Sequence, residues 1–175
     1  MTELDEIFGE SNRPVSFEDI QSLRYMEQVI QETWRLFPPI PMIAKKPTTD
    51  IQLENCVLPE GSTIAIIIMA MHRNPTQFPN PDVFNPDNFL PERIKARHPY
   101  SFIPFSAGSR TCIGAKYAML LVKVMLATLL RSYRVYSKRR ERDFVLAGQT
   151  VLKRREGFLI NLKPREKSSM IIAAA

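Results

Sequence analysis

Apolar side chains recur every three or four positions from Leu23 onward, which is the spacing of one face of an α-helix. Ser16 followed by Asp19 is a helix-capping sequence, and Pro38 cannot continue a helix. The pattern therefore predicts an amphipathic helix that starts near Ser16 and ends before Pro38. A second helix is predicted over residues 114–133, where apolar residues lie on most sides and favour a buried position.

Two hairpins are predicted from alternation and from turn residues. Residues 50–53 alternate weakly, Pro59-Glu60-Gly61 marks a turn, and the β-branched run 63–71 predicts one buried strand. Near the end of the chain, segments 144–146 and 158–162 are predicted to pair as a closing hairpin. The fold class that follows is α+β and mainly α, with small sheets.

Residues 72–111 show neither a helical nor a strand period. Seven prolines lie between Pro75 and Pro104, and they argue against regular helix or central strand there. Long segments of this kind in a compact domain are typical of functional loops. Aromatic residues recur through the segment, so it is expected to pack without being regular: Phe78, Phe84, Phe89, Tyr100, Phe102 and Phe105.

Composition is that of a soluble globular protein, with 175 residues, 45% hydrophobic and 24% charged, which argues against global disorder and fibrous classes. The net charge is +6, but residues 1–32 carry eight acids and two bases, so the remainder is strongly basic. Charge alone does not choose among phosphates, a membrane surface and an acidic protein as partner. Much of the positive charge lies in a basic cluster of Arg131, Arg134, Lys138, Arg139, Arg140 and Arg142.

Cysteine usage and hydropathy indicate the compartment. Cys56 and Cys112 form no CxxC pair, and the acidic start resembles neither a signal nor a transit peptide, which argues for free thiols in a reducing compartment. No apolar run reaches the roughly 18 to 20 residues that a membrane span needs. Any membrane contact of this chain is expected to be peripheral or to depend on a segment that it lacks.

Cys112 stands between Gly108 and Gly114, directly before the second predicted helix, with Arg110 two residues upstream. A helix N-terminus and a nearby cation both favour a thiolate. Glycines allow backbone amides to approach a sulfur atom or a flat ligand closely. The pattern suits an anionic sulfur ligand or a nucleophile, and an inert buried cysteine in a glycine turn is the simpler alternative.

Three chemistries compete for Cys112. A cysteine hydrolase needs a base, which His72 or His98 supplies in principle, but neither histidine has a recognisable orienting partner. Zinc would draw on these residues and Cys56, which lack the short paired spacing of structural zinc sites. Heme iron with a cysteine thiolate ligand is the third chemistry.

Three motifs follow one another along the chain: Glu32-Thr-Trp-Arg35, Pro91-Glu92-Arg93 and the glycine-rich segment around Cys112. In order and spacing they resemble the motifs of the cytochrome P-450 superfamily of heme-thiolate monooxygenases. Glu32-Thr-Trp-Arg35 is similar to the Glu-x-x-Arg helix motif, and Pro91-Glu92-Arg93 is similar to the Pro-Glu-Arg meander motif. The resemblance covers residues 6–164 and is greatest to family four, whose animal members often hydroxylate fatty acids. The heme-binding loop is matched by Phe105, Gly108, Arg110, Cys112 and Gly114.

The resemblance implies a role for each matched residue. Cys112 would be the proximal thiolate ligand of the heme iron, with amides near Gly114 hydrogen-bonding its sulfur. Phe105 would pack beside the proximal heme face, Arg110 would pair with a propionate, and Lys45 would take the place of a second propionate-binding arginine. A buried ion-pair network locking the meander onto the first helix would consist of Glu32, Arg35 and Arg93.

The resemblance also implies the fold and the reaction. Residues 1–165 would be the C-terminal heme-binding part of the P-450 fold, followed by a tail at 166–175. The parent reaction inserts one oxygen atom from O₂ into an apolar substrate, with electrons from NADPH through a flavoprotein reductase. Cytochrome b5 is a further expected partner, and nucleic acid is not expected. Lys116 and the cations from Arg131 onward are expected to meet the acidic reductase.

Members of this branch act at the cytosolic face of the endoplasmic reticulum membrane. The oxygen-activating helix, the distal substrate pocket and the N-terminal anchor are expected to be missing from this sequence, so no catalytic residue is assigned. The alternative function is that of a non-catalytic fragment that binds heme or other proteins.

Overall fold

The computed structural model describes residues 1–138, 143–148 and 150–165 and divides them into two compact units. The first unit contains the described residues of Met1–Glu27, Gly114–Val145 and Glu156–Ala175, and the second contains Gln28–Ile113 and Leu146–Arg155. The tail predicted at 166–175 lies outside the described residues, as do three members of the basic cluster: Arg139, Arg140 and Arg142.

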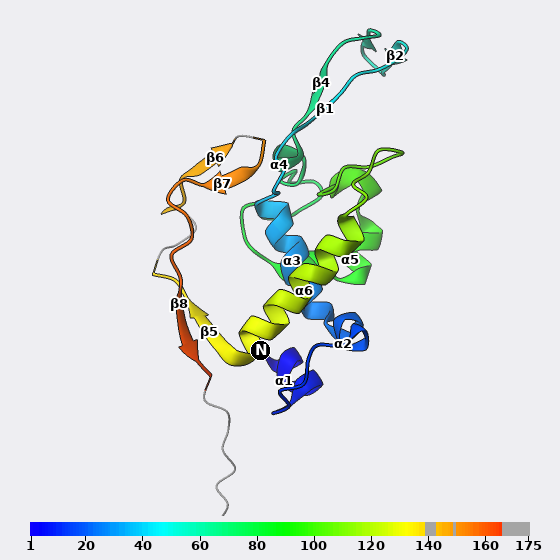
Figure 1. Ribbon diagram of the computed structural model, residues 1–175. Helices are drawn as coiled ribbons and strands as arrows, with labels where there is room; N and C mark the ends of the chain where they lie inside the picture. The colour runs from blue at the N-terminus through cyan, green and yellow to red at the C-terminus, as the bar shows by residue number, and fades with distance from the viewer. Residues whose placement is uncertain (139–142, 149, 166–175) are drawn as a thin grey trace, which may run out of the picture. The chain divides into compact units, whose positions relative to one another are not determined.

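The first unit is built on the long helix α6 (Ala115–Ser132), which contacts α1 (Thr2–Phe8) and α2 (Phe17–Ser22), as Figure 1 shows. Directly after α6, β5 (Tyr133–Tyr136) pairs antiparallel with β8 (Asn161–Pro164). Burial of apolar side chains from these helices removes them from water and forms the core of the unit. That core contains Leu4, Phe8, Ile20, Leu23, Met26 and Ala127.

The first predicted helix is two helices, α2 and α3 (Arg24–Leu36). The capping box at its start is confirmed, because Ser16 and Asp19 exchange side-chain-to-backbone hydrogen bonds. Leu23 interrupts the helix, with a ψ of 70° and a fully buried side chain. The Glu3 carboxylate then accepts hydrogen bonds from the first-turn amides of α3, at Tyr25 and Met26, which satisfies donors that a helix start leaves free.

The second unit carries most of α3 and two pairs of short strands in one hairpin arm. In that arm β1 (Ile43–Lys45) pairs with β4 (Ile64–Ile66), and β2 (Ile51–Gln52) pairs with β3 (Val57–Leu58). The predicted strand over 63–71 ends at Ile66, because the chain turns there into α4 (Ile68–Met71).

The predicted closing hairpin is wrong in its pairing. Segment 144–146 contributes to β6 (Leu146–Gly148), which pairs with β7 (Leu152–Arg154), and segment 158–162 contributes to β8, which pairs with β5. Closing the short connection between β6 and β7 costs less chain entropy than bringing 144–146 to 158–162. Alternation alone does not identify which strand is the partner.

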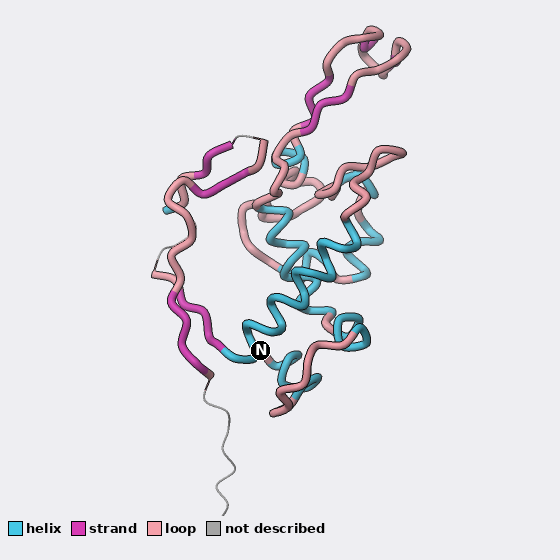
Figure 2. Tube along the Cα trace, in the orientation of Figure 1, coloured by secondary structure: helices cyan, strands magenta, loops and turns pink. Residues whose placement is uncertain are grey.

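Residues 72–111 form the meander, which is largely irregular in Figure 2 but contains three short helices. These are η1 (Pro86–Phe89), α5 (Pro91–Ala96) and η2 (Pro99–Ser101). Each begins with a proline, whose missing N–H is not needed in a first helical turn. The prolines therefore start short helices here. Phe78 and Phe89 are buried, as expected of a packed irregular segment.

Helix α6 has the predicted position but not the predicted burial. Lys123 and Ala127 are its buried residues, and Tyr117, Leu121 and Met125, spaced four apart, are exposed. No helix among the described residues is long and apolar enough to cross a membrane.

Candidate functional site

The cysteine loop, residues 105–112, is closed by its own backbone. The Cys112 N–H donates to the Phe105 carbonyl oxygen at 2.9 Å, and the Thr111 hydroxyl donates to the same oxygen at 3.2 Å. Gly108 turns the loop with a φ of 85°, which L side chains rarely adopt. These contacts leave the Cys112 side chain exposed at the loop's end.

Phe105 connects the loop to the helix that carries Glu32 and Arg35. Its ring meets the ring of Trp34 edge-on, with the centroids 4.9 Å apart and an interplanar angle of 88°. Arg110 is exposed, and Gly114 is the N-cap residue of α6. The structure thus brings Phe105 and Cys112 together and leaves the Arg110 side chain exposed to solvent.

Glu32 and Arg35 form a fully buried ion pair, with both side chains 0% exposed. Arg35 Nε and Nη2 donate to the two Glu32 carboxylate oxygens at 2.8 Å each, a bidentate arrangement. Arg35 also donates to the carbonyl oxygens of His72, Pro81 and Val83 at 3.1, 2.6 and 3.1 Å. The guanidinium thereby makes five hydrogen bonds, one for each of its N–H donors. One buried side chain consequently holds three points of the meander.

Two asparagines of the meander donate hydrogen bonds to the Glu32 carboxylate. The Asn85 N–H donates to Glu32 Oε1 at 2.8 Å, and Asn88 Nδ2 donates to the same oxygen at 3.2 Å. Arg93, the expected third member of the network, is exposed on α5, and in the described structure Glu32 accepts from Arg35, Asn85 and Asn88. The η1 turn directs Asn88 inward, whereas α5 leaves Arg93 at its surface.

His72 has a structural role in the fold, whereas from the sequence it was a candidate only as a base or a zinc ligand. Its buried Nε2 accepts the Ile103 N–H at 2.9 Å, which requires a neutral ring. Burial lowers the pKa of His72 to about 4, the Arg35 charge acts in the same direction, and backbone carbonyls of α3 oppose it. The sequence signal for this role is the position of His72 directly after a run of apolar residues.

The competing chemistries for Cys112 gain no support from the geometry. His98 Nδ1 accepts the Tyr100 N–H at 3.2 Å, and the His72 Nε2 lone pair is likewise committed to a backbone amide. Across the described ranges, no group of three or more His, Cys, Asp or Glu residues is placed to hold a metal ion. Lys45 is half-buried on β1, opposite Ile64 in the hairpin arm.

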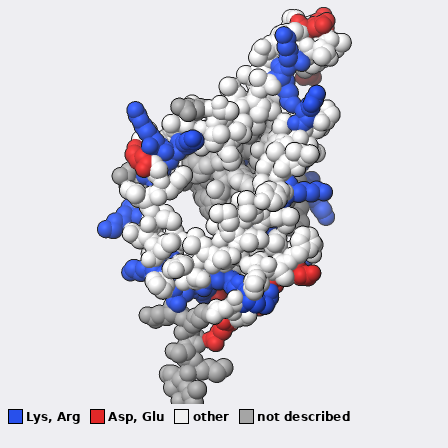
Figure 3. All heavy atoms as spheres, viewed as in Figure 1, with Lys and Arg blue, Asp and Glu red and all other residues white. Residues whose placement is uncertain are grey.

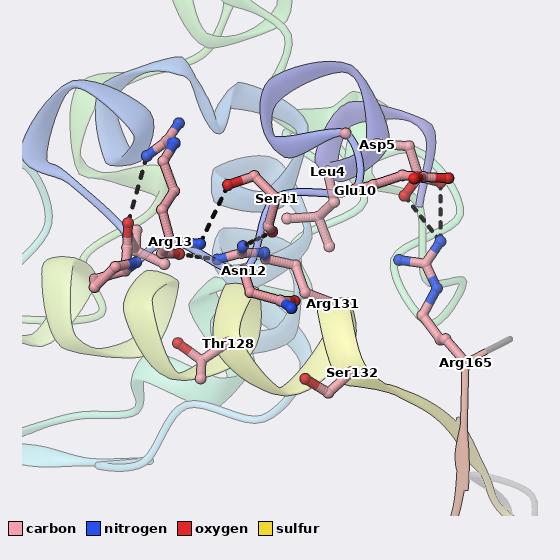
Figure 4. A pocket seen from close by; sticks show the side chains of 13 residues that line it. Leu4, Asp5, Glu10, Ser11, Asn12, Arg13, Thr128, Arg131, Ser132 and Arg165 are labelled. Atoms are coloured by element: carbon pink, nitrogen blue, oxygen red, sulfur yellow. Dashed lines mark hydrogen bonds and ion pairs between the residues drawn. The ribbon is translucent and has the colours of Figure 1, made fainter. Parts of the chain in front are cut away.

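A pocket of about 480 Å³ lies in the first unit, between residues 9–15 and the end of α6 (Figure 4). Arg131 borders it and donates to the carbonyl oxygens of Ser11 and Arg13, while Arg165 pairs with Asp5 at 2.8 Å. The residues that line this pocket include none of those expected to bind heme. Lysine and arginine predominate over acids on the face drawn in Figure 3.

The fold is that of part of a P450 heme domain. The chain superposes on the retinoic acid-bound cyanobacterial CYP120A1 with a TM-score of 0.84 and 23% identity, covering 94% of this chain and 37% of that one. The heme domain of cytochrome P450DA gives a TM-score of 0.85, again with 23% identity, and with coverage of 94% and 36%.

The chain belongs to the cytochrome P450 family, whose model matches residues 1–162. It is 50% identical over 167 residues to cytochrome P450 4g15 of Drosophila melanogaster and 43% identical over 163 residues to human cytochrome P450 4V2. These matches cover 94% and 93% of this chain but 29% and 31% of the relatives, so the chain spans about a third of their length. The resemblance to family four is confirmed, and family membership implies heme as cofactor.

Proposed function

We propose that this chain carries the heme-thiolate half of a monooxygenase site, with Cys112 as the iron ligand. The observation that carries the proposal is the exposed Cys112 thiol, held at the end of a loop whose backbone is fixed by Phe105 and Thr111. An exposed, rigidly presented sulfur suits a flat ligand that must approach it closely.

The other residues fit the group by their chemistry. Arg110 is exposed and Lys45 is half-buried, and both supply positive charge for propionates. Phe105 would supply an aromatic surface beside the bound group, and amides near Gly114 would hydrogen-bond the ligating sulfur. Glu32 and Arg35 hold the meander without touching the reacting atoms.

When bound, heme supplies the activation of O₂ for insertion of one oxygen atom into an apolar substrate, for which fatty acids are the first class to test. Electrons come from NADPH through a flavoprotein reductase, with cytochrome b5 as a second donor. The whole protein acts at the cytosolic face of the endoplasmic reticulum membrane.

The test of ligation is the carbon monoxide difference spectrum of the purified, reduced chain supplied with hemin. We expect a thiolate-type Soret band that Cys112→Ser abolishes and Cys56→Ser retains, since Cys56 is the other exposed thiol of the described chain. The absence of that band from the wild-type spectrum, or its persistence in Cys112→Ser, refutes the assignment. Turnover with a reductase and a fatty acid then separates an enzyme from a non-catalytic heme-binding fragment.

The reductase is expected to bind exposed cations of the first unit. Charge reversal at Lys116 and Arg134, both exposed, should lower the rate of heme reduction and weaken its salt dependence. Reversal at Lys95, an exposed residue of α5, is the matched control and should leave both unchanged. Equal effects in the two variants contradict this docking surface.

A further inference from the structure

Arg97 occupies a half-buried position directly after α5, between two aromatic rings of the meander. Its guanidinium carbon lies 4.4 Å from the centroid of the Phe78 ring and 5.0 Å from that of Phe89. The Arg35 guanidinium carbon lies 5.1 Å from the same Phe78 ring, which is fully buried. One ring therefore connects the buried ion pair on α3 to a second arginine from the far part of the meander.

The charges of Arg97 and Glu32 lie close enough to interact. Burial lowers the pKa of Arg97, and the negative charge of Glu32 is the cause that opposes this shift. Among the described residues Arg97 forms no ion pair, so its aromatic contacts hold the guanidinium in place.

The aromatic contacts continue from Arg97 toward the cysteine loop. Phe89 meets Phe102 with ring centroids 4.6 Å apart, and Phe102 meets the His72 ring at 4.9 Å. His72 Nε2 accepts the Ile103 N–H, and the Ile103 carbonyl oxygen accepts a hydrogen bond from Ser106, a residue of that loop. These contacts form a continuous series from Arg97 to the segment that carries Cys112.

We propose that Arg97 is a positioning residue that holds the meander against α3, a role that the family resemblance implied for Arg93, and thereby orients the cysteine loop. The effect on the cysteine loop rests on the proposed heme-thiolate function, whereas the effect on the meander does not. Arg93 and Arg97 lie four residues apart, and only Arg97 is half-buried between rings, so the two arginines form a matched pair for substitution.

The first experiment measures amide hydrogen exchange in the 175-residue chain without hemin. The reporters are the Asn85 amide, which donates to Glu32, and the Ile103 amide, which donates to His72. Arg97→Ala is expected to speed exchange at both by about tenfold, the size expected for two partly desolvated cation–π contacts. Arg93→Ala is expected to change it by less than about twofold. The Ala127 amide in α6 of the first unit is the reference for global unfolding and should not change.

Three results overturn the proposal. They are equal acceleration in the Arg93 and Arg97 variants, no acceleration in Arg97→Ala, and an Ala127 amide that accelerates as much as the two reporters. If Arg97→Ala does not fold, Arg97→Lys decides, since lysine keeps the charge but lacks the planar group that stacks on a ring. The Asn85 and Ile103 amides should exchange faster in Arg97→Lys than in Arg93→Lys, and equal rates in the two variants overturn the proposal.

The second experiment adds hemin to the same variants. The thiolate-type Soret band should weaken in Arg97→Ala and persist in Arg93→Ala, while a band of wild-type strength in Arg97→Ala overturns the link to the cysteine loop. If the wild-type chain lacks the band, the proposed function fails by itself, and the exchange data still decide whether Arg97 holds the meander.

Discussion

Lowering the pH is expected to destabilise this chain through the buried ring of His72, the clearest pH dependence in the structure. Its Nε2 accepts the Ile103 N–H, so protonation replaces an acceptor by a donor inside a fully buried site. Arg35 and Arg73 lie close enough to disfavour a further positive charge on the ring. The folded state therefore resists a proton that the unfolded state accepts.

The size of the effect follows from the pKa of His72, which is about 4 in the folded chain against 6.5 for an ordinary histidine. At each pH between these values the unfolded state binds more protons, so stability falls as pH falls through this window. Above about pH 6.5 the neutral His72 ring makes its full contribution to the free energy of unfolding. Below about pH 4 the ring is protonated in both states, and no further stability is lost through it. The difference corresponds to about 3 kcal/mol, a large part of the roughly 5–15 kcal/mol that stabilises a typical domain.

The assay is urea unfolding at a series of pH values across this window, followed by far-UV circular dichroism. His72→Gln should be less stable than wild type near neutral pH and should have a shallower pH slope, whereas His98→Gln should keep the wild-type slope because the buried ring is still present. Asp19, whose carboxyl pKa is held well below the usual range by Arg13, adds little above about pH 4.5, because an ordinary aspartate with a pKa of about 3.9 is also ionised there in the unfolded chain. The reasoning fails if wild type and His72→Gln show the same slope between about pH 6.5 and pH 4.5.

Three further predictions concern buried or capping charges, each measured by urea unfolding at neutral pH. Arg35→Lys should lower the free energy of unfolding by about 3–5 kcal/mol, because lysine cannot reproduce the bidentate pair and the three carbonyl contacts. A loss below about 1 kcal/mol contradicts the role assigned to the guanidinium. Glu27→Gln should destabilise the chain more than Lys123→Met, because it leaves the Lys123 ammonium, whose side chain is 4% exposed, without its carboxylate partner. A larger loss of stability in Lys123→Met refutes this reasoning. Glu3→Gln should cost about 1 kcal/mol as the cap of α3 weakens, and a cost equal to that of Glu6→Gln, on the same helix, argues against capping.

Helix positions were predictable because their signals are local. The Ser16 capping box and the end of α3 before Pro38 follow from residues that are neighbours in sequence. The break at Leu23 was not predictable, because it depends on Glu3, a carboxylate from another helix that caps the second segment. The burial of α6 was overestimated for a related reason. An apolar face is buried only where another element covers it, and periodicity does not say whether the chain supplies one.

In the candidate site, too, contacts between neighbours in sequence were predictable, whereas contacts between distant segments were not. Spacing alone paired Glu32 with Arg35, since residues three apart lie on one helix face. Arg93 was assigned to the network by the family resemblance, and it is exposed, because the direction of a side chain in an irregular segment depends on short turns such as η1 and α5. Arg97 lacks a motif, and its position became evident only from the rings of Phe78 and Phe89.

The exposed residues of the cysteine loop contribute little to the orientation of the loop. Ser109, Arg110 and Cys112 are exposed, so the loop's orientation depends on its inner contacts, where Phe105 meets Trp34 and Ile103 meets His72. Those contacts come from α3 and the residue that ends α4, far from Cys112 in sequence. A substitution at His72 should therefore disturb thiolate ligation more than one at Ser109, although Ser109 is much closer along the chain. Comparing the hemin spectra of His72→Gln and Ser109→Ala tests this directly, and a larger loss in Ser109→Ala means that the loop orients itself.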